Sequence, residues 1–246
     1  MICGRPDWEV LFSLYQEKRL NPMSFLQSEE FLDILTKSCL THYPYIAFAD
    51  AFHTMRSMLL PVLYLLGTEV PKADVYHAIC TGYGGMLACL GGWMYQKKVL
   101  LTEHGIYTRE REEEIIRAKW VVPSFKKQWI SFFYMLSDII YRRAFQVTCL
   151  FTNAMLIQIQ MGCDAKKCRV IENGIHYERL SQIPLKQEDG WVDIGAVVRL
   201  APIKDIKTMI YAFLSCPCER KMCGCISWAV WTMRNMLQSV MRWWSS

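Results

Sequence analysis

Short apolar runs that alternate with helical stretches constrain this chain more than any other feature of its sequence. The runs Ala73–Ile79, Val99–Thr102 and Val147–Phe151 have the length of β-strands, and helical patterns separate them. Two further runs of this kind are Cys168–Ile171 and Val192–Val198. Alternating strands and helices predict an α/β fold with a parallel sheet and helices on both of its faces.

The helical stretches are recognised by apolar residues that recur with the period of an α-helix. Residues 1–40 carry two such stripes, and a charged segment covers Thr108–Lys119. The other predicted helices cover Phe48–Leu66, Met86–Tyr95, Trp129–Phe145, Thr152–Met161 and a segment near Asp205–Phe213.

The most apolar segments do not have the pattern of membrane spans. Met58–Gly67 is too short to cross a bilayer and contains Pro61, and three charged residues interrupt Phe132–Phe151. Both are therefore predicted to be buried helices. The first eight residues lack the apolar core of a secretory signal, and seven of the cysteines are scattered among apolar neighbours like buried free thiols. These features favour a reducing, cytoplasmic location.

The charge of the chain argues against nucleic acid as a partner. The formal net charge is +5, from 28 basic and 23 acidic residues, and the excess lies mainly in residues 211–246. The remainder is close to neutral and carries no basic stripe.

Ligands of parallel α/β sheets bind beyond the carboxyl ends of the strands, and three segments of this sequence fall there. The first is Thr81–Gly85, in which Gly82, Gly84 and Gly85 would let the backbone approach a ligand and leave helix-start N–H groups free for an anion. Glycine-rich turns are common at this position in such folds, so this segment alone is weak evidence for binding.

The second segment is Thr102–Glu112, in which Glu103-His104-Gly105 comes directly after the apolar run Val99–Thr102. A histidine in such a loop can donate a hydrogen bond to a sugar hydroxyl or a phosphate oxygen. The alternative is that His104 only satisfies a backbone carbonyl, and its position alone does not decide between the two.

The third segment, Val197–Asp205, places Arg199 and Lys204 on a proline-containing turn after a strand. Two cations at this spacing suit a diphosphate, since Arg can bind two oxygens and Lys adds a point charge. The alternative is an ordinary pair of exposed bases.

Taken together, these segments resemble glycosyltransferase family 4, and in part its PelF-type branch. Cys168–Ile175 (CRVIENGI) resembles the interdomain motif of the family, and Val197–Asp205 resembles its donor-binding motif. Leu100–Ile115 (LLTEHGIYTREREEEI), with Ala73–Gly85 upstream, resembles the PelF-type members specifically. The resemblance extends roughly from Trp8 to Phe213.

The resemblance implies a GT-B architecture of two Rossmann-like domains and a metal-independent, retaining transfer of a sugar. The donor would be a nucleotide sugar, UDP-glucose in PelF-type members, and the acceptor a growing exopolysaccharide. No cofactor or metal would be needed. Membrane-bound subunits of a polysaccharide export system would be the partners. The alternative function is a non-catalytic module that holds a saccharide or a partner subunit.

The roles of single residues follow from the same resemblance. His104 maps onto the cleft histidine that faces the transferred sugar, and Arg199 and Lys204 map onto the diphosphate-binding pair. The cleft loops would consist of Gly82, Gly84, Gly85, Glu103 and Gly105.

The resemblance also predicts a domain organisation and a departure from the family. Residues 1–171 would form an incomplete acceptor-side domain, 172–191 a linker, 192–213 the start of a donor domain and 214–246 an aberrant tail. Members of the family carry a glutamate pair after the donor motif, whereas Glu219 is the only acid after Asp205. The chain is therefore expected to be a fragment, truncated at both ends, with little or no activity.

The tail allows two further interpretations. Cys216, Cys218, Cys223 and Cys225 could supply four thiolates to zinc, but single-residue spacing and the lack of a nearby histidine disfavour that site. We favour the hypothesis that the tail is translated out of frame, because a shift of two bases across Trp231–Leu237 yields an acidic helix start that would suit a donor domain.

Overall fold

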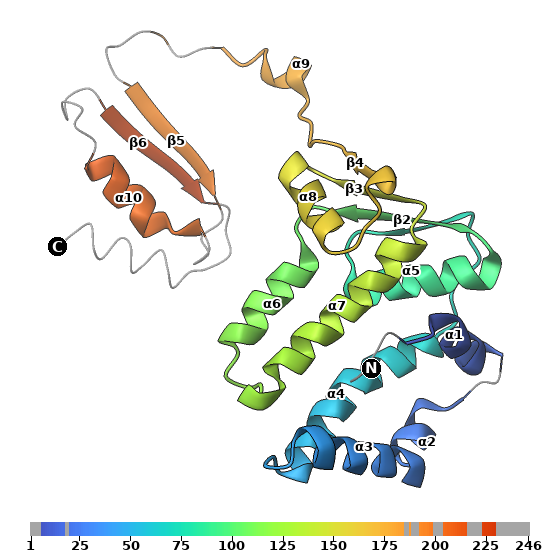
Figure 1. The fold of residues 1–246 in the computed structure, drawn as a ribbon. Helices are drawn as coiled ribbons and strands as arrows, with labels where there is room; N and C mark the ends of the chain where they lie inside the picture. The colour runs from blue at the N-terminus through green and yellow to red at the C-terminus, as the bar shows by residue number, and fades with distance from the viewer. Residues whose placement is uncertain are drawn as a thin grey trace. The chain divides into compact units, whose positions relative to one another are not determined.

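The computed structural model describes residues 6–17, 20–184, 187, 192–198, 204–215 and 223–229 of the 246-residue chain (Figure 1). The chain divides into two compact units, Met1–Gly174 and Ile175–Ser246. The boundary falls inside the segment 172–191. The helices of the first unit are α1 (Trp8–Gln16), α2 (Pro22–Leu26), α3 (Glu29–His42), α4 (Phe48–Leu66), α5 (Gly82–Tyr95), α6 (Tyr107–Arg117), α7 (Lys126–Arg143) and α8 (Thr152–Gln160).

The first unit contains a four-stranded sheet in which all strands are parallel. Its strands are β1 (Val75–Ala78), β2 (Lys98–Glu103), β3 (Gln146–Cys149) and β4 (Cys168–Val170), and they lie in the order β1-β2-β3-β4. The registers Ala78↔Leu101 and Glu103↔Cys149 bring the carboxyl ends of β1, β2 and β3 to one edge. The predicted parallel α/β class is thus confirmed.

The helices that connect the strands share one face of this sheet, and not both faces as the alternation suggested. Helices α5, α7 and α8 all pack against strands, and on that face Tyr76, Leu101 and Val147 are buried. On the opposite face Val75 and His77 are exposed. The strand order explains the difference, because right-handed crossovers between successive neighbours put every helix on the same side.

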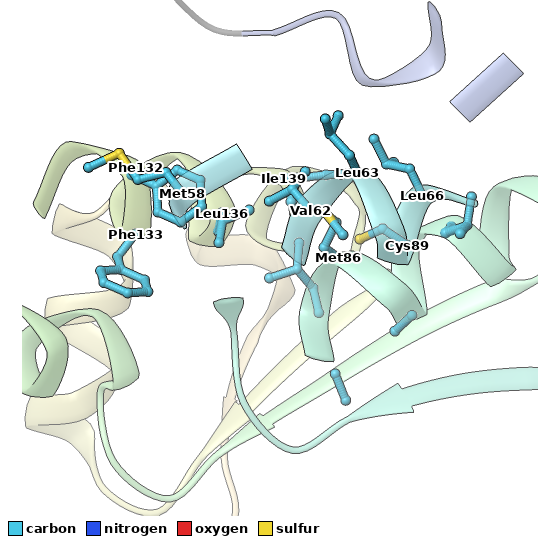
Figure 2. Packing of buried hydrophobic residues seen from close by; sticks show 14 of the residues in the cluster. Met58, Val62, Leu63, Leu66, Met86, Cys89, Phe132, Phe133, Leu136 and Ile139 are labelled. Atoms are coloured by element: carbon cyan, nitrogen blue, oxygen red, sulfur yellow. The ribbon is translucent and has the colours of Figure 1, made fainter. Parts of the chain in front are cut away.

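A second layer of helices packs on the helices that cover the sheet. The apolar faces of the two layers form the core (Figure 2). Helix α4 packs on α5 and contacts α1, α2 and α3. Met58, Val62 and Leu66 lie one helical turn apart along α4 and are all buried, together with Met86 of α5 and Leu136 of α7. This spacing is the pattern of a helix with one apolar face. None of the described helices is both long and apolar enough to span a membrane.

The second unit contains α9 (Tyr177–Leu180), β5 (Val192–Val198), α10 (Ile206–Leu214) and β6 (Cys223–Ala229). Strands β5 and β6 pair in parallel from Val192↔Cys223 to Val198↔Ala229, and α10 lies between them in the chain. The sequence predicted β5 and α10 but no strand over β6. Arg199, Cys216, Cys218 and the segment Trp231–Leu237 lie outside the described residues, and so the zinc and frameshift interpretations of the tail stay hypotheses.

Candidate functional site

The carboxyl ends of β1 and β2 bring two of the three predicted segments together. The turn after β1 leads into α5 at Gly82, and the loop after β2 leads into α6 at Tyr107. The two turns are in direct contact: a Cβ placed on Gly82 would lie 2.5 Å from Cε1 of Tyr107. Gly82 also has a φ of 68°, in the left-handed region that glycine tolerates best. A glycine is required here both by the backbone and by the aromatic ring beside it.

The three glycines of the first segment lie in the first turn of α5 and not in an open loop. Helix α5 begins at Gly82, four residues before the predicted start at Met86. A Cβ on Gly84 would lie 3.4 Å from Sγ of Cys80, and one on Gly85 would lie 3.0 Å from Cγ2 of Ile140. Gly84 therefore allows Cys80 of the preceding turn to pack closely on α5, and Gly85 allows α7 to do so.

His104 and Gly105 are exposed beyond the end of β2. No hydrogen bond or ion pair of the His104 ring is found within the described residues, so the ring is free to contact a solute. The carboxylate of Glu110, in the first turn of α6, lies over Gly105 and occupies the space that a side chain there would need. The Glu110 carboxylate thus lies against the residue that follows His104.

Glu103 differs from its neighbour because its side chain points into the protein. It is only 1% exposed, and its Oε2 accepts hydrogen bonds from the hydroxyl of Tyr141 at 2.7 Å and from Nε2 of Gln158 at 2.9 Å. Burial raises the pKa of the Glu103 carboxyl, while Tyr141, Gln158 and the backbone N–H of Tyr107 act in the opposite direction. Glu103 therefore joins β2 to α7 and α8 and does not line a cleft, contrary to the predicted role.

Three buried hydroxyl groups behind the glycine turn form a chain that the sequence did not reveal. Ser137 of α7 donates to Oγ1 of Thr81 at 2.8 Å, and its Oγ lies 2.6 Å from Oγ1 of Thr108. Since a serine has one hydroxyl proton, Thr108 must donate to Ser137 in this arrangement. The chain joins the turn after β1, α7 and the start of α6. A serine within a helical pattern carries no hint of such a partner.

A second polar row crosses the exposed face of the sheet near the same edge. Nε2 of His77 lies 2.8 Å from Oγ1 of Thr102, which lies 2.7 Å from Oγ1 of Thr148. Thr148 in turn donates to the carbonyl of Leu101 at 3.3 Å. The row thus joins β1, β2 and β3 through side chains on this face. His77 is not among the predicted site residues, since the sequence predicts its strand to be buried.

Two cavities of the first unit lie away from this edge. One has a volume of about 570 Å³ and is lined almost entirely by apolar side chains of α1, α3, α4 and α7, including Leu35, Met58 and Met135. The other, of about 430 Å³, is polar and lies near the amino end of β2, where Lys98 and Arg143 line it. Neither contains His104 or the glycine turn.

The predicted diphosphate pair belongs to the second unit. Lys204 is exposed, and Arg199 lies outside the described residues. Asp205, which follows Lys204, accepts hydrogen bonds from the Thr208 hydroxyl at 2.7 Å and from its backbone N–H at 3.3 Å. These bonds lower the pKa of the Asp205 carboxyl. The Asp205 carboxylate thus caps the start of α10, directly after Lys204.

The chemistry open to this edge is hydrogen bonding between His104 and a polar ligand. No group of three or more His, Cys, Asp or Glu side chains with the geometry of a metal site occurs in the described part of the chain. The first unit is thus a parallel α/β domain with a histidine and a tight glycine turn at the carboxyl edge of its sheet.

The sequence matches, over residues 5–166, a family described as a domain of unknown function, DUF3492. The match covers most of the first unit and more than half of the chain, so this protein belongs to the DUF3492 family. That domain is associated with glycosyltransferases. No curated protein matches the sequence.

Proposed function

We propose that this chain is the acceptor-side part of a PelF-type glycosyltransferase, together with the start of its donor domain. The complete enzyme would move glucose from UDP-glucose to a growing exopolysaccharide in the cytoplasm, with retention of configuration. His104 would contact the transferred sugar, and Arg199 and Lys204 would bind the diphosphate.

The observation that carries this proposal is the contact between the two turns at the carboxyl edge of the sheet. Gly82 packs against Tyr107, so the turn after β1 and the loop that holds His104 are fixed beside each other. The ring of His104 is exposed at that place. Neutral imidazole can donate one hydrogen bond and accept another, which suits a sugar hydroxyl. The association of the DUF3492 domain with glycosyltransferases supports the same proposal.

The electrostatic part of the proposed mechanism concerns the leaving nucleotide. As the bond between sugar and diphosphate breaks, negative charge develops on the departing phosphate oxygens. Fixed cations at that position would stabilise the transition state more than the bound substrate. Lys204 is exposed just before α10, so its charge is open to such an anion, whereas the Asp205 carboxylate already accepts the backbone N–H of Thr208 at the helix start.

A binding experiment tests the proposal without requiring turnover by this chain. UDP-glucose and a short gluco-oligosaccharide would each be titrated into the full chain, and the ring signals of His104 would be followed by NMR. We expect the His104 signals to shift with a sugar ligand, and His104→Ala to weaken the binding of that ligand, measured by calorimetry, without unfolding. The matched control is His53→Ala, an exposed histidine on α4, which should leave binding unchanged.

Each result has a distinct meaning. Shifts with UDP-glucose that Lys204→Ala weakens would support the transferase. A response to the oligosaccharide alone would favour the non-catalytic, saccharide-holding alternative. If neither ligand perturbs His104, the proposed site is wrong.

A further inference from the structure

Two buried oxygen atoms at the end of β2 lack the partners that buried polar groups normally have. Oε1 of Glu103 and Oε1 of Gln158 are both shielded from solvent and accept no hydrogen bond in the described structure. Both side chains are almost completely buried, at 1% and 0% exposure. A buried acceptor without a donor costs about 1–3 kcal/mol, so two in one place call for an explanation.

The orphaned atoms belong to side chains that already touch. Nε2 of Gln158 donates to Oε2 of Glu103 at 2.9 Å. A single added proton would supply the missing hydrogen bond. If Oε1 of Glu103 carried this proton, the acid O–H could donate to Oε1 of Gln158. The two groups would then share two hydrogen bonds in a ring, with the amide N–H on one side and the acid O–H on the other. One proton thus satisfies both atoms.

The remaining contacts of Glu103 agree with this arrangement. Oε2, which would be the carbonyl oxygen of the neutral acid, accepts from Tyr141 as well as from Gln158. A carbonyl oxygen has two lone pairs for these two donors. The backbone N–H of Tyr107 favours the charged form, but Oε1 accepts no hydrogen bond from it.

Within the described part of the chain, the ionisable groups that surround Glu103 supply no positive charge. Those facing it from the packed elements are Glu110 of α6, Tyr141 of α7, Cys80 after β1, Cys149 of β3 and Cys163 after α8. All are acids, and no basic side chain of the described residues acts on the carboxyl. An ionised Glu103 would be a buried charge without a counter-ion, which proteins avoid.

We propose that Glu103 is held as a neutral carboxylic acid in a cyclic double hydrogen bond with Gln158. This pair fixes the end of β2, and through it the loop that presents His104. Glu103 is therefore a buried positioning residue, and the exposed His104 follows it directly in the chain. This inference stands apart from the proposed function, because it rests only on contacts within the first unit.

Infrared spectroscopy of the full chain tests the protonation state directly. At about pH 6, exposed carboxyls with an ordinary pKa of about 4.3 are ionised and lack the carbonyl band of a neutral acid. We expect the unmodified chain to keep one such band, and Glu103→Gln to lose it. Gln158→Leu should shift the band, because the acid loses its partner. Absence of the band in the unmodified chain, or a band that Gln158→Leu leaves unchanged, would overturn the proposal.

A comparison of stability with pH gives an independent test. Gln at position 103 can form the same ring with Gln158 but has no proton to lose, so it is the matched variant. As pH rises above the ordinary carboxyl pKa, the unfolding equilibrium constant of the unmodified chain should increase relative to Glu103→Gln by up to about tenfold per pH unit. Equal pH dependence of the two proteins would contradict the neutral acid.

The positioning role has its own readout in amide hydrogen exchange. Exchange at His104 and Gly105, corrected for its intrinsic pH dependence, should accelerate in the unmodified chain as Glu103 ionises. In Glu103→Gln it should stay slow over the same range. The same acceleration in both proteins would show that the acid–amide pair does not fix this loop.

Discussion

Replacement of Gly82 by alanine tests the packing of the two turns most sharply. A Cβ at this position would lie 2.5 Å from Cε1, 2.9 Å from Cζ and 3.1 Å from the hydroxyl oxygen of Tyr107. A left-handed backbone costs a non-glycine residue about 1–2 kcal/mol. Overpacking against a ring costs about 1–3 kcal/mol more. The sum predicts that Gly82→Ala lowers the free energy of unfolding of the first unit by about 2–5 kcal/mol.

Two further variants separate the contributions. Gly162 has a φ of 102°, and a Cβ placed on it would meet nothing within 4 Å, so Gly162→Ala should show the backbone cost alone, about 1–2 kcal/mol. In a double-mutant cycle, Tyr107→Ala should recover the overpacking part of the Gly82→Ala effect, about 1–3 kcal/mol.

Urea unfolding followed by tryptophan fluorescence, with hydrogen exchange of the β2 amides as a second probe, measures these differences. Hydrogen exchange assigns the effect to the first unit, since fluorescence reports on both units. If Gly82→Ala costs no more than Gly162→Ala, or shows no coupling with Tyr107→Ala, the contact between the turns is not as described.

Three other predictions concern the core and its polar groups. Leu101→Ala, in a fully buried position of β2, should cost about 2–5 kcal/mol of stability in urea unfolding, and no loss would contradict the packing. Ser137→Ala removes the central member of the buried hydroxyl chain and should cost about 1–3 kcal/mol, whereas Ser137→Thr should cost less if the hydroxyl is what matters. Burial raises the pKa of Tyr83 from 10.0 to about 12, so its folded state favours the neutral phenol. Stability is therefore expected to fall as pH rises from about 10 to about 12, and Tyr83→Phe should reduce that fall in alkaline unfolding curves.

Local sequence patterns predicted most elements of this fold, although they predicted no strand over β6. The period of apolar residues along Phe48–Leu66 defines α4 with those bounds, and Val192–Val198 is β5 as predicted. The helical period of apolar residues and the length of apolar runs predict which side chains become buried, and both are local features of the sequence. The parallel pairing follows from the alternation of strands and helices.

The candidate site was accessible from the sequence only in part. His104 follows an apolar strand, and the structure places it exposed at the sheet edge. The sequence predicts the preceding residue, Glu103, to belong to the same loop, yet it lies inside the protein. Side chains alternate between the two faces of a strand, so adjacent residues point in opposite directions. Strand β2 ends at Glu103, one residue later than predicted. Glu103 therefore still belongs to the strand and points inward, whereas His104 lies in the loop and is exposed.

Tertiary structure alone decided how the polar interior is connected and which face of the sheet is covered. Thr81, Ser137 and Thr108 come from three separate elements, and Glu103 meets Gln158 across 55 residues of chain. Such partners are set by the packing of α7 and α8 on the sheet, which no local pattern encodes. The strand order likewise set every connecting helix on one side. The sequence by itself determined most of the helices and strands, because the apolar residues that become buried form local patterns along the chain. The pairing of buried polar groups emerged only when those elements were packed together in space.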